Sequence, residues 1–240
     1  MRVCVIGAGY MGLVTGVCLA HIGHEVICVD NHGETVKLMR AGQSPIFEPG
    51  LSELMQAEIA AQRIKFTLDL ATGIAHGDIL FITTDTPHQP TTESDTRYVE
   101  TIAWRIGTHL KGDYKVIVNK STKPIGSGDR MRMMVLDGIA ERQQALAPAG
   151  VSADTTLNMV DFDVVNHLEF LRSGSVVYDI FNPDRIVLEG NSSRAIALIQ
   201  QLYAPIISRE FAEDKSLPTV PVLVTDLSFV GKQTLCSEHR

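Results

Sequence analysis

The chain has 240 residues, of which 45% are hydrophobic, and its formal net charge is −7. This length predicts one large domain, or one domain and part of another, with enough apolar residues for a sizeable core. The negative charge argues against a general affinity for nucleic acid, and no apolar run is long enough to cross a bilayer. The N-terminus enters a strand pattern at once, without the features of a secretory leader. We therefore expect a cytoplasmic protein without nucleic-acid or membrane partners.

Short apolar runs alternate with segments of helical spacing along most of the chain. The apolar runs predict strands over residues 2–7, 24–30, 64–70, 78–87, 114–122 and 184–190. The helical spacing predicts helices over residues 12–23, 34–42, 51–63, 97–110, 123–144 and 193–207. Residues 71–77 are consistent with a short helix or a turn, and residues 162–175 resume the strand-to-loop pattern.

Strand and helix alternate in this way from residue 1 to about residue 190. That order predicts an α/β fold with a doubly wound, mostly parallel sheet and helices on both faces. We expect residues 1–190 to form a Rossmann-like domain and residues 191–240 a connecting helix and a tail. Residues 145–158 predict a surface excursion. The apolar side chains of residues 193–207 should lie uncovered and promote self-association.

Three glycines after the first predicted strand fit the pattern G-x-G-x-x-G. Gly7 permits a tight turn, Gly9 allows the backbone to approach a diphosphate, and Gly12 lets a helix pack closely on the strand. The same glycines could form a simple turn, but Asp30 ends the second strand about twenty residues further on, as NAD binding requires. Asp30 would accept hydrogen bonds from a ribose and repel the extra phosphate of NADP. We therefore expect residues 1–190 to bind NAD.

The four cysteines, Cys4, Cys18, Cys28 and Cys236, include no C-x-x-C pair. This spacing gives little support to a zinc site, and we expect no metal. The first three lie in apolar strand or helix runs. Buried free thiols in a reducing compartment are a better interpretation than a disulfide framework.

Longer motifs carry a resemblance to a known family. They read "VIGAGYMGL", "GHEVICVD", "PIFEPGLSEL", "DILFITTDTP", "NKSTKPIGSGD", "FDVV", "EFLRSGS" and "NPDRIVLEG". In these stretches the chain resembles the UDP-glucose/GDP-mannose dehydrogenase family, most closely its UDP-glucose 6-dehydrogenase branch. The similarity covers residues 1 to about 190, and a weaker similarity extends to about residue 227. "PIFEPGL" and "KST-x-P-x-G" are far more specific than the glycine pattern, and "PIFEPGL" argues against another hydroxyacid-type dehydrogenase.

The resemblance implies an oxidoreductase that acts on a nucleotide sugar, UDP-glucose first among the candidates. The family oxidises the C6 alcohol to a carboxylate in two hydride transfers to NAD, which for UDP-glucose gives UDP-glucuronate. A cysteine thiol holds the intermediate, and water then hydrolyses the thioester. The protein supplies position and charge around the cofactor.

The family's functional positions fall on identifiable residues of this chain. The resemblance assigns cofactor contacts to Gly7, Gly9, Tyr10, Met11, Gly12, Asp30, Thr35, Thr86 and Thr122. It assigns catalytic roles to Thr122, which can also bond a catalytic water, and to Glu169, a general base or water anchor of the hydrolysis step. It assigns sugar contacts to Glu169, Phe170, Leu171, Arg172 and Ser173. For Arg172, and likewise for Asp184 and Arg185, we favour the interpretation as a surface or ion-pair group over a direct functional role.

Several positions depart from the family pattern. Asp85 stands where the family usually has a small residue, and its carboxylate would repel a nearby diphosphate. Thr35 stands where a basic residue is common, and Ser173 replaces a second glutamate. Both Asp85 and Thr35 predict weaker NAD binding than in a full-length relative.

The C-terminal end departs most. The family continues after residue 227 with a helix that bears a catalytic lysine and asparagine. A dimer helix, a glycine-rich loop with the nucleophilic cysteine and a UDP-binding domain follow it, and none of these patterns occurs here. Cys236 lacks the family's glycine setting, so we interpret it as an incidental thiol rather than the nucleophile. A premature stop or frameshift after about residue 228 would explain a truncated tail. The alternative function is thus an NAD-binding remnant or module, and we expect no UDP-glucuronate from these residues alone.

Overall fold

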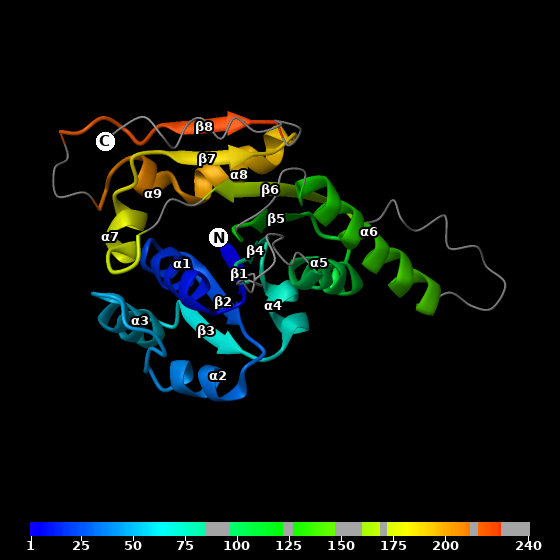
Figure 1. The fold of residues 1–240 in the computed structure, drawn as a ribbon, viewed down its shortest axis with the longest axis horizontal. Coiled ribbons are helices and arrows are strands. Elements are labelled where there is room, and N and C mark those ends of the chain that lie inside the picture. The colour runs from blue at the N-terminus through cyan, green and yellow to red at the C-terminus, as the bar shows by residue number, and fades with distance from the viewer. Residues whose placement is uncertain (85–96, 122–126, 147–159, 169–171, 212–215, 227–240) are drawn as a thin grey trace, which may run out of the picture.

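The computed structural model describes residues 1–84, 97–121, 127–146, 160–168, 172–211 and 216–226. Within these residues eight strands form one sheet in the order β3-β2-β1-β4-β5-β6-β7-β8 (Figure 1). The strands are β1 (Arg2–Ile6), β2 (Glu25–Val29), β3 (Ile64–Thr67), β4 (Ile79–Ile82), β5 (Lys115–Asn119), β6 (Phe162–Leu168), β7 (Ile186–Glu189) and β8 (Val222–Thr225). The order reverses between β1 and β4, so these two strands flank the switch point where doubly wound sheets bind ligands.

Strands β1 to β6 run parallel to one another, and β7 runs antiparallel to β6. Asn166 of β6 lies opposite Asn119 of β5 on one side and Glu189 of β7 on the other. The edge strand β8 pairs with β7 in parallel. The prediction of a doubly wound, mostly parallel sheet is therefore confirmed.

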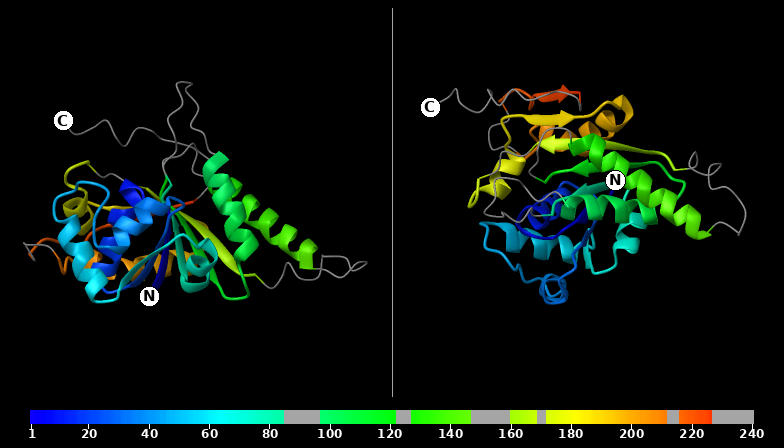
Figure 2. Two further views of the ribbon diagram at one scale, coloured as in Figure 1. Left: turned by 90° about the horizontal axis from the view of Figure 1, so that it is seen from below. Right: turned by 45° about the vertical axis from the view of Figure 1, so that its right-hand side comes forward.

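Helices cover both faces of the sheet, as Figure 2 shows. They are α1 (Tyr10–His21), α2 (Gly33–Arg40), α3 (Leu51–Ala60), α4 (Leu70–His76), α5 (Arg97–His109), α6 (Ser127–Leu146), α7 (Val176–Phe181), α8 (Ser193–Leu202) and α9 (Ala204–Ile207). The side-chain alternation of a strand divides the interior into two cores. Val3 and Val5 of β1 enter the core beneath α1 and α8, whereas Cys4 and Ile6 enter the core beneath α4, α5 and α6.

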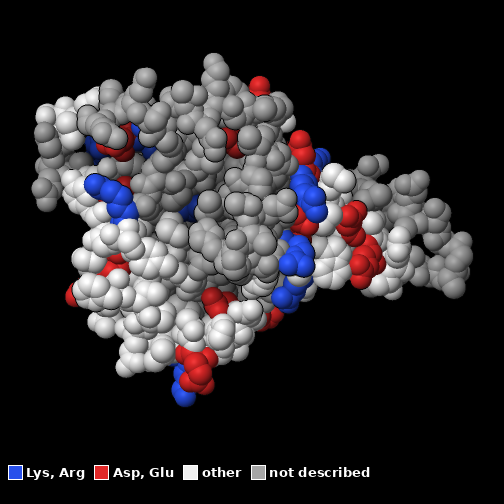
Figure 3. All heavy atoms as spheres, in the orientation of Figure 1, with Lys and Arg blue, Asp and Glu red and all other residues white. Residues whose placement is uncertain are grey.

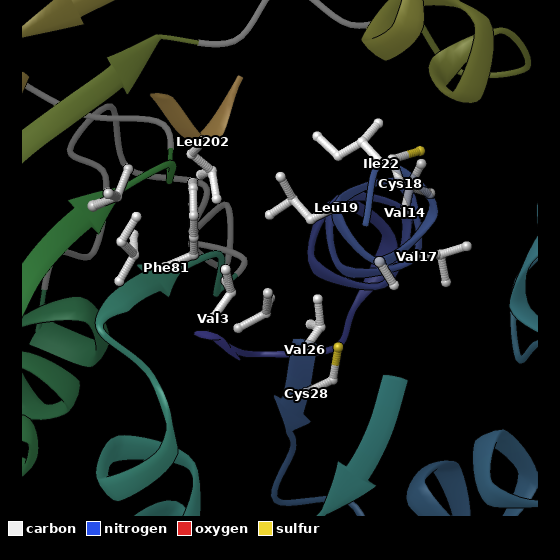
Figure 4. Close-up of a cluster of buried hydrophobic side chains, with 14 of the residues drawn as sticks. Val3, Val14, Val17, Cys18, Leu19, Ile22, Val26, Cys28, Phe81 and Leu202 are labelled. Carbon is white, nitrogen blue, oxygen red and sulfur yellow. The ribbon is translucent and has the colours of Figure 1, made fainter. Parts of the chain in front are cut away.

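The first of these cores gathers side chains from distant parts of the chain. Figure 4 shows Val3, Val26 and Phe81 from three strands together with Leu19 of α1 and Leu202 of α8. Each of these side chains is at most 2% exposed. Full burial of such a side chain stabilises the fold by about 1.5–3 kcal/mol. This core therefore fixes α1, and with it the glycine turn, on the sheet.

The thiols of Cys4, Cys18 and Cys28 are free and buried in these cores. Burial raises the pKa of Cys4 to about 12 and raises the pKa of Cys18 and Cys28 still further above the ordinary value. For these three cysteines the expectation of buried free thiols is confirmed, and Cys236 lies outside the described residues. None of the helices that the structure describes is long and apolar enough to span a membrane.

The segment 193–207 differs from the sequence prediction in two ways. It forms two helices, because α8 ends at Leu202 and Tyr203 separates it from the short helix α9, which has Pro205 in its first turn. The expectation of uncovered apolar side chains is wrong, since Ala195, Ile199 and Leu202 are fully buried. Helix α8 packs against β6, and Ile186 and Leu188 of β7 belong to the same core. Self-association stays a prediction, but these side chains do not support it.

Two short elements, α7 and β8, were not expected from the sequence. The residues of α7, "VVYDIF", are rich in β-branched and aromatic types that have low helix propensity.

On the face that Figure 3 shows, the described acidic and basic side chains lie interleaved rather than separated by sign.

Candidate functional site

Two positions at the turn between β1 and α1, Gly7 and Gly12, accept only glycine. Gly7 has a φ of +96° and donates its N–H to the carbonyl of Val29 at 2.8 Å. A Cβ atom on Gly12 would lie 1.8 Å from the carbonyl oxygen of Gly7. The hydroxyl of Thr83, at the end of β4, donates to the same oxygen at 2.7 Å. The turn is thus held closely against the ends of β2 and β4.

The N-terminus of α1 presents open backbone donors beside this turn. Its N-cap is Gly9, and no side chain among the described residues caps it. The first amides of a helix have no partner within the helix, so they are available to an anion. Tyr10 and Met11 form the first turn and are both partly buried.

The carboxylate of Asp30 faces the turn from the end of β2. Its Oδ2 accepts the N–H of Ala8 at 2.8 Å, and its Oδ1 accepts the N–H of His32 at 2.8 Å. Each oxygen keeps a second lone pair, so the group can still accept the two hydroxyls of a ribose. Donors for a diphosphate and an acceptor for a ribose therefore lie together, and these residues fit NAD.

The other predicted site residues divide between described and undescribed segments. Thr35 lies partly buried on α2, five positions after Asp30. Arg172 and Ser173 are exposed in the loop before α7. The remaining ones lie outside the described residues: Thr86, Thr122, Glu169, Phe170 and Leu171, together with Asp85.

Arg172 forms an ion pair with Asp179 of α7. Its Nη2 lies 2.7 Å from Oδ1 of Asp179, and Ser175 donates to the other carboxylate oxygen at 3.0 Å. The hydrogen bonds from Arg172 are the largest of the effects that lower the pKa of Asp179. This pair gives the loop before α7 a defined shape.

Glu48, in the loop between α2 and α3, was not singled out in the sequence beyond its place in "PIFEPGL". Its carboxylate is 4% exposed. It accepts hydrogen bonds from the hydroxyl of Tyr10 and from the backbone N–H groups of Gly174 and Val176. The one carboxylate thus touches both the glycine turn and the loop that holds Arg172 and Ser173.

A cavity of about 450 Å³ lies beside α1 at the ends of β5 and β6. The residues that line it include Thr15, Lys120, His167, Arg172 and Tyr203. The Nζ of Lys120 lies 3.2 Å from Nδ1 of His167. Burial lowers the pKa of Lys120 to about 7 and lowers the pKa of His167 well below its ordinary value.

The Lys120–His167 pair was also missed in the sequence, although a signal for it exists. Lys120 follows the fully buried run of β5 directly, and His167 lies near the end of β6. Polar residues at the carboxyl ends of adjacent parallel strands meet at one edge of the sheet, where such folds bind their ligands. That rule would have placed both residues near the glycine turn.

Comparison with known proteins gives matches over most of the chain. Residues 1–207 match the NAD binding domain model of the UDP-glucose/GDP-mannose dehydrogenase family. The chain is 38% identical over 236 residues to the UDP-glucose 6-dehydrogenase TuaD of Bacillus subtilis, which covers 96% of this chain and 47% of that protein.

Two solved structures are similar over nearly the whole chain. A UDP-glucose dehydrogenase from Pyrobaculum islandicum gives a TM-score of 0.78 at 32% identity, over 95% of this chain and 47% of that one. GDP-mannose dehydrogenase from Pseudomonas aeruginosa gives a TM-score of 0.79 at 27% identity, again over 95% and 47%. This chain spans about half the length of the curated relatives it matches. The resemblance found in the sequence motifs is confirmed.

Proposed function

Because this chain belongs to the UDP-glucose/GDP-mannose dehydrogenase family, we propose that it forms the NAD-binding part of an oxidoreductase that converts the C6 alcohol of a nucleotide sugar to a carboxylate. UDP-glucose is the substrate we propose, since the relatives that align over most of this chain are UDP-glucose 6-dehydrogenases. The observation that carries the proposal is the glycine turn with Asp30 facing it. The cofactor of the matching domain is NAD.

The residues of this chain would act as follows. The open amides of the first turn of α1 hold the diphosphate, and Asp30 accepts the ribose hydroxyls. Bound NAD supplies the chemistry by accepting a hydride from the alcohol. We propose that Thr122 and Glu169 hold a water or a proton near the reacting carbon, and that Arg172 and Ser173 belong to the loop that holds the sugar.

A cytoplasmic location is part of the same proposal, and the free thiols of Cys4, Cys18 and Cys28 support it.

The choice between NAD and NADP tests the role of Asp30. We expect the protein to bind NADH at least about tenfold more tightly than NADPH, because the carboxylate repels a 2′-phosphate. Asp30→Ser should reduce this preference, since serine keeps a hydrogen-bonding group but removes the charge. Isothermal titration calorimetry with both cofactors measures the two affinities.

The matched control for this experiment is Asp69→Ser. Asp69 also follows a strand and caps a helix, accepting the N–H of Ala71 at 3.0 Å, but it lies before α4 rather than at the turn. It should leave the preference unchanged. Equal or tighter binding of NADPH by the unmodified protein would contradict the proposal for Asp30.

A further inference from the structure

Glu48 joins two segments that lie far apart in the sequence. Its Oε1 accepts the N–H of Val176 at 2.7 Å, and its Oε2 accepts the N–H of Gly174 at 3.0 Å and the hydroxyl of Tyr10. Tyr10 begins α1, whereas Gly174 and Val176 lead into α7. The same Gly174 N–H lies 3.3 Å from the hydroxyl oxygen of Tyr10, so the three groups form one connected network.

This hydrogen-bond network stabilises Glu48 in its ionised form. Burial disfavours the ionised form of Glu48, but the hydrogen bonds from Tyr10 and from the backbone before α7 outweigh it and lower its pKa. The donors that the structure describes for this carboxylate are all neutral. A buried carboxylate that loses its hydrogen-bond donors costs much free energy. The folded protein therefore holds each of these donors in place.

The two joined segments are the ones that the proposed function assigns to different ligands. Under that proposal the first turn of α1 would face the diphosphate of the cofactor, and residues 172–176 include Arg172 and Ser173, which would contact the sugar. Gly174 has a φ of +90°, a conformation that glycine adopts readily but shares with many others in a free chain. The bond from its N–H to Glu48 helps to hold this one conformation.

We propose that Glu48 is a positioning residue that couples NAD binding at the α1 turn to the conformation of the loop formed by residues 172–176. The proposal rests on the proposed function, because it takes the α1 turn as the cofactor site. A diphosphate bound to the first amides of α1 fixes the helix start and therefore the hydroxyl of Tyr10. That hydroxyl fixes one oxygen of Glu48, and the carboxylate then holds the amides of Gly174 and Val176. By thermodynamic linkage, a loop held in this way also favours the cofactor.

Hydrogen exchange at single amides tests this coupling. In the unmodified protein, NADH should slow exchange at the amides of Gly174 and Val176 by about fivefold. In Glu48→Gln this slowing should be lost, and the affinity for NADH should fall by a similar factor. The glutamine keeps the size of the side chain but removes the charge and places an amide donor against two N–H groups. NMR measures the exchange rates, and fluorescence titration measures NADH binding on the same samples.

Glu58→Gln is the matched control, because Glu58 is a carboxylate as deeply buried as Glu48 and its pKa is likewise lowered against the effect of burial. Its partners are Arg63 at 2.6 Å and His21 at 3.0 Å, away from the turn. It should lower the thermal stability but keep both NADH binding and the NADH-dependent slowing at residues 174 and 176. Tyr10→Phe is a second variant that leaves the carboxylate in place, and it should weaken the slowing even if Glu48→Gln does not fold.

The outcomes separate the two proposals. NADH binding without any change in exchange at Gly174 and Val176 would overturn the coupling and leave the proposed function standing. Slowing that survives in Glu48→Gln or in Tyr10→Phe would overturn it as well. Failure of the unmodified protein to bind NADH would overturn the proposed function itself, and the titration detects this independently of the exchange rates.

Discussion

Gly12→Ala is expected to abolish measurable NADH binding and to destabilise the domain by about 3 kcal/mol or more. The added Cβ would lie 1.8 Å from the carbonyl oxygen of Gly7 and 2.5 Å from the hydroxyl oxygen of Thr83. The first of these atoms is backbone in the turn itself, so α1 must move away from β1 to relieve the contact. That movement displaces the amides that would bind the diphosphate, and the affinity should fall by at least about 100-fold.

NADH fluorescence titration and thermal unfolding measure the two effects of Gly12→Ala. The control is Gly33→Ala, because a Cβ on Gly33 would meet no atom within 4 Å. Gly33 is the first residue of α2, where alanine favours the helix. The control should keep the affinity and the stability of the unmodified protein. Near-normal NADH binding by Gly12→Ala would show that the cofactor does not use this turn.

The free energy of unfolding is expected to rise between pH 7 and pH 8.5 because of Lys120. Burial lowers the pKa of Lys120 to about 7 in the folded protein, whereas an exposed lysine titrates near 10.5. Across this interval the unfolded chain binds a proton that the folded chain has released. Stability therefore rises with pH, by about 1 to 2 kcal/mol for this group, and is lost as the pH falls towards 7.

Lys120→Met should remove this part of the pH dependence, because methionine fills a similar space without a charge. Urea unfolding at a series of pH values gives the slope for each protein. Lys37→Met, at an exposed position of α2, serves as the control and should keep the slope. The three buried thiols oppose this trend from about pH 8 upwards, because thiols in the unfolded chain begin to ionise as the pH approaches 9.0 whereas burial keeps them protonated in the folded protein. Lys120→Met leaves that opposing contribution unchanged. An unchanged slope in Lys120→Met would contradict the assignment.

The sequence predicts the local part of this fold well. Strands β1, β2, β4 and β5 are short apolar runs because both faces of the sheet are covered, and such runs can be recognised without knowing their neighbours. The glycine turn and Asp30 are also recognisable, because their residues lie within a single βαβ unit. By contrast, the start of helix α7 is held by the distant Glu48, and the burial of α8 depends on its packing against β6, which belongs to another part of the chain.

The missed site residues have the same physical explanation. Glu48 and Val176 are separated by 128 positions, and Lys120 and His167 by 47. No sequence pattern joins Glu48 to Val176, because Glu48 lies in the loop before α3 and Val176 begins α7. Lys120 and His167 lie near the ends of their strands, but their contact forms only once β5 and β6 pair. "PIFEPGL" marked Glu48 as characteristic of a family but gave no indication of what its carboxylate holds. Sequence reasoning thus found the glycine turn but not the groups that connect it to its surroundings.

The three buried thiols give the first βαβ unit a reporter of its own opening. Cys4 and Cys28 lie on adjacent strands, Cys18 lies on the helix above them, and the side chains of all three are almost completely shielded from solvent. A thiol that is shielded and protonated reacts with neither oxidants nor alkylating reagents at neutral pH. Covalent labelling of Cys28 can therefore proceed only in the rare moments when α1 separates from the sheet, whereas labelling of Cys4 requires the opposite face of the sheet, beneath α4, to open. The labelling rate of Cys28 would measure how often α1 leaves the sheet in an otherwise folded molecule.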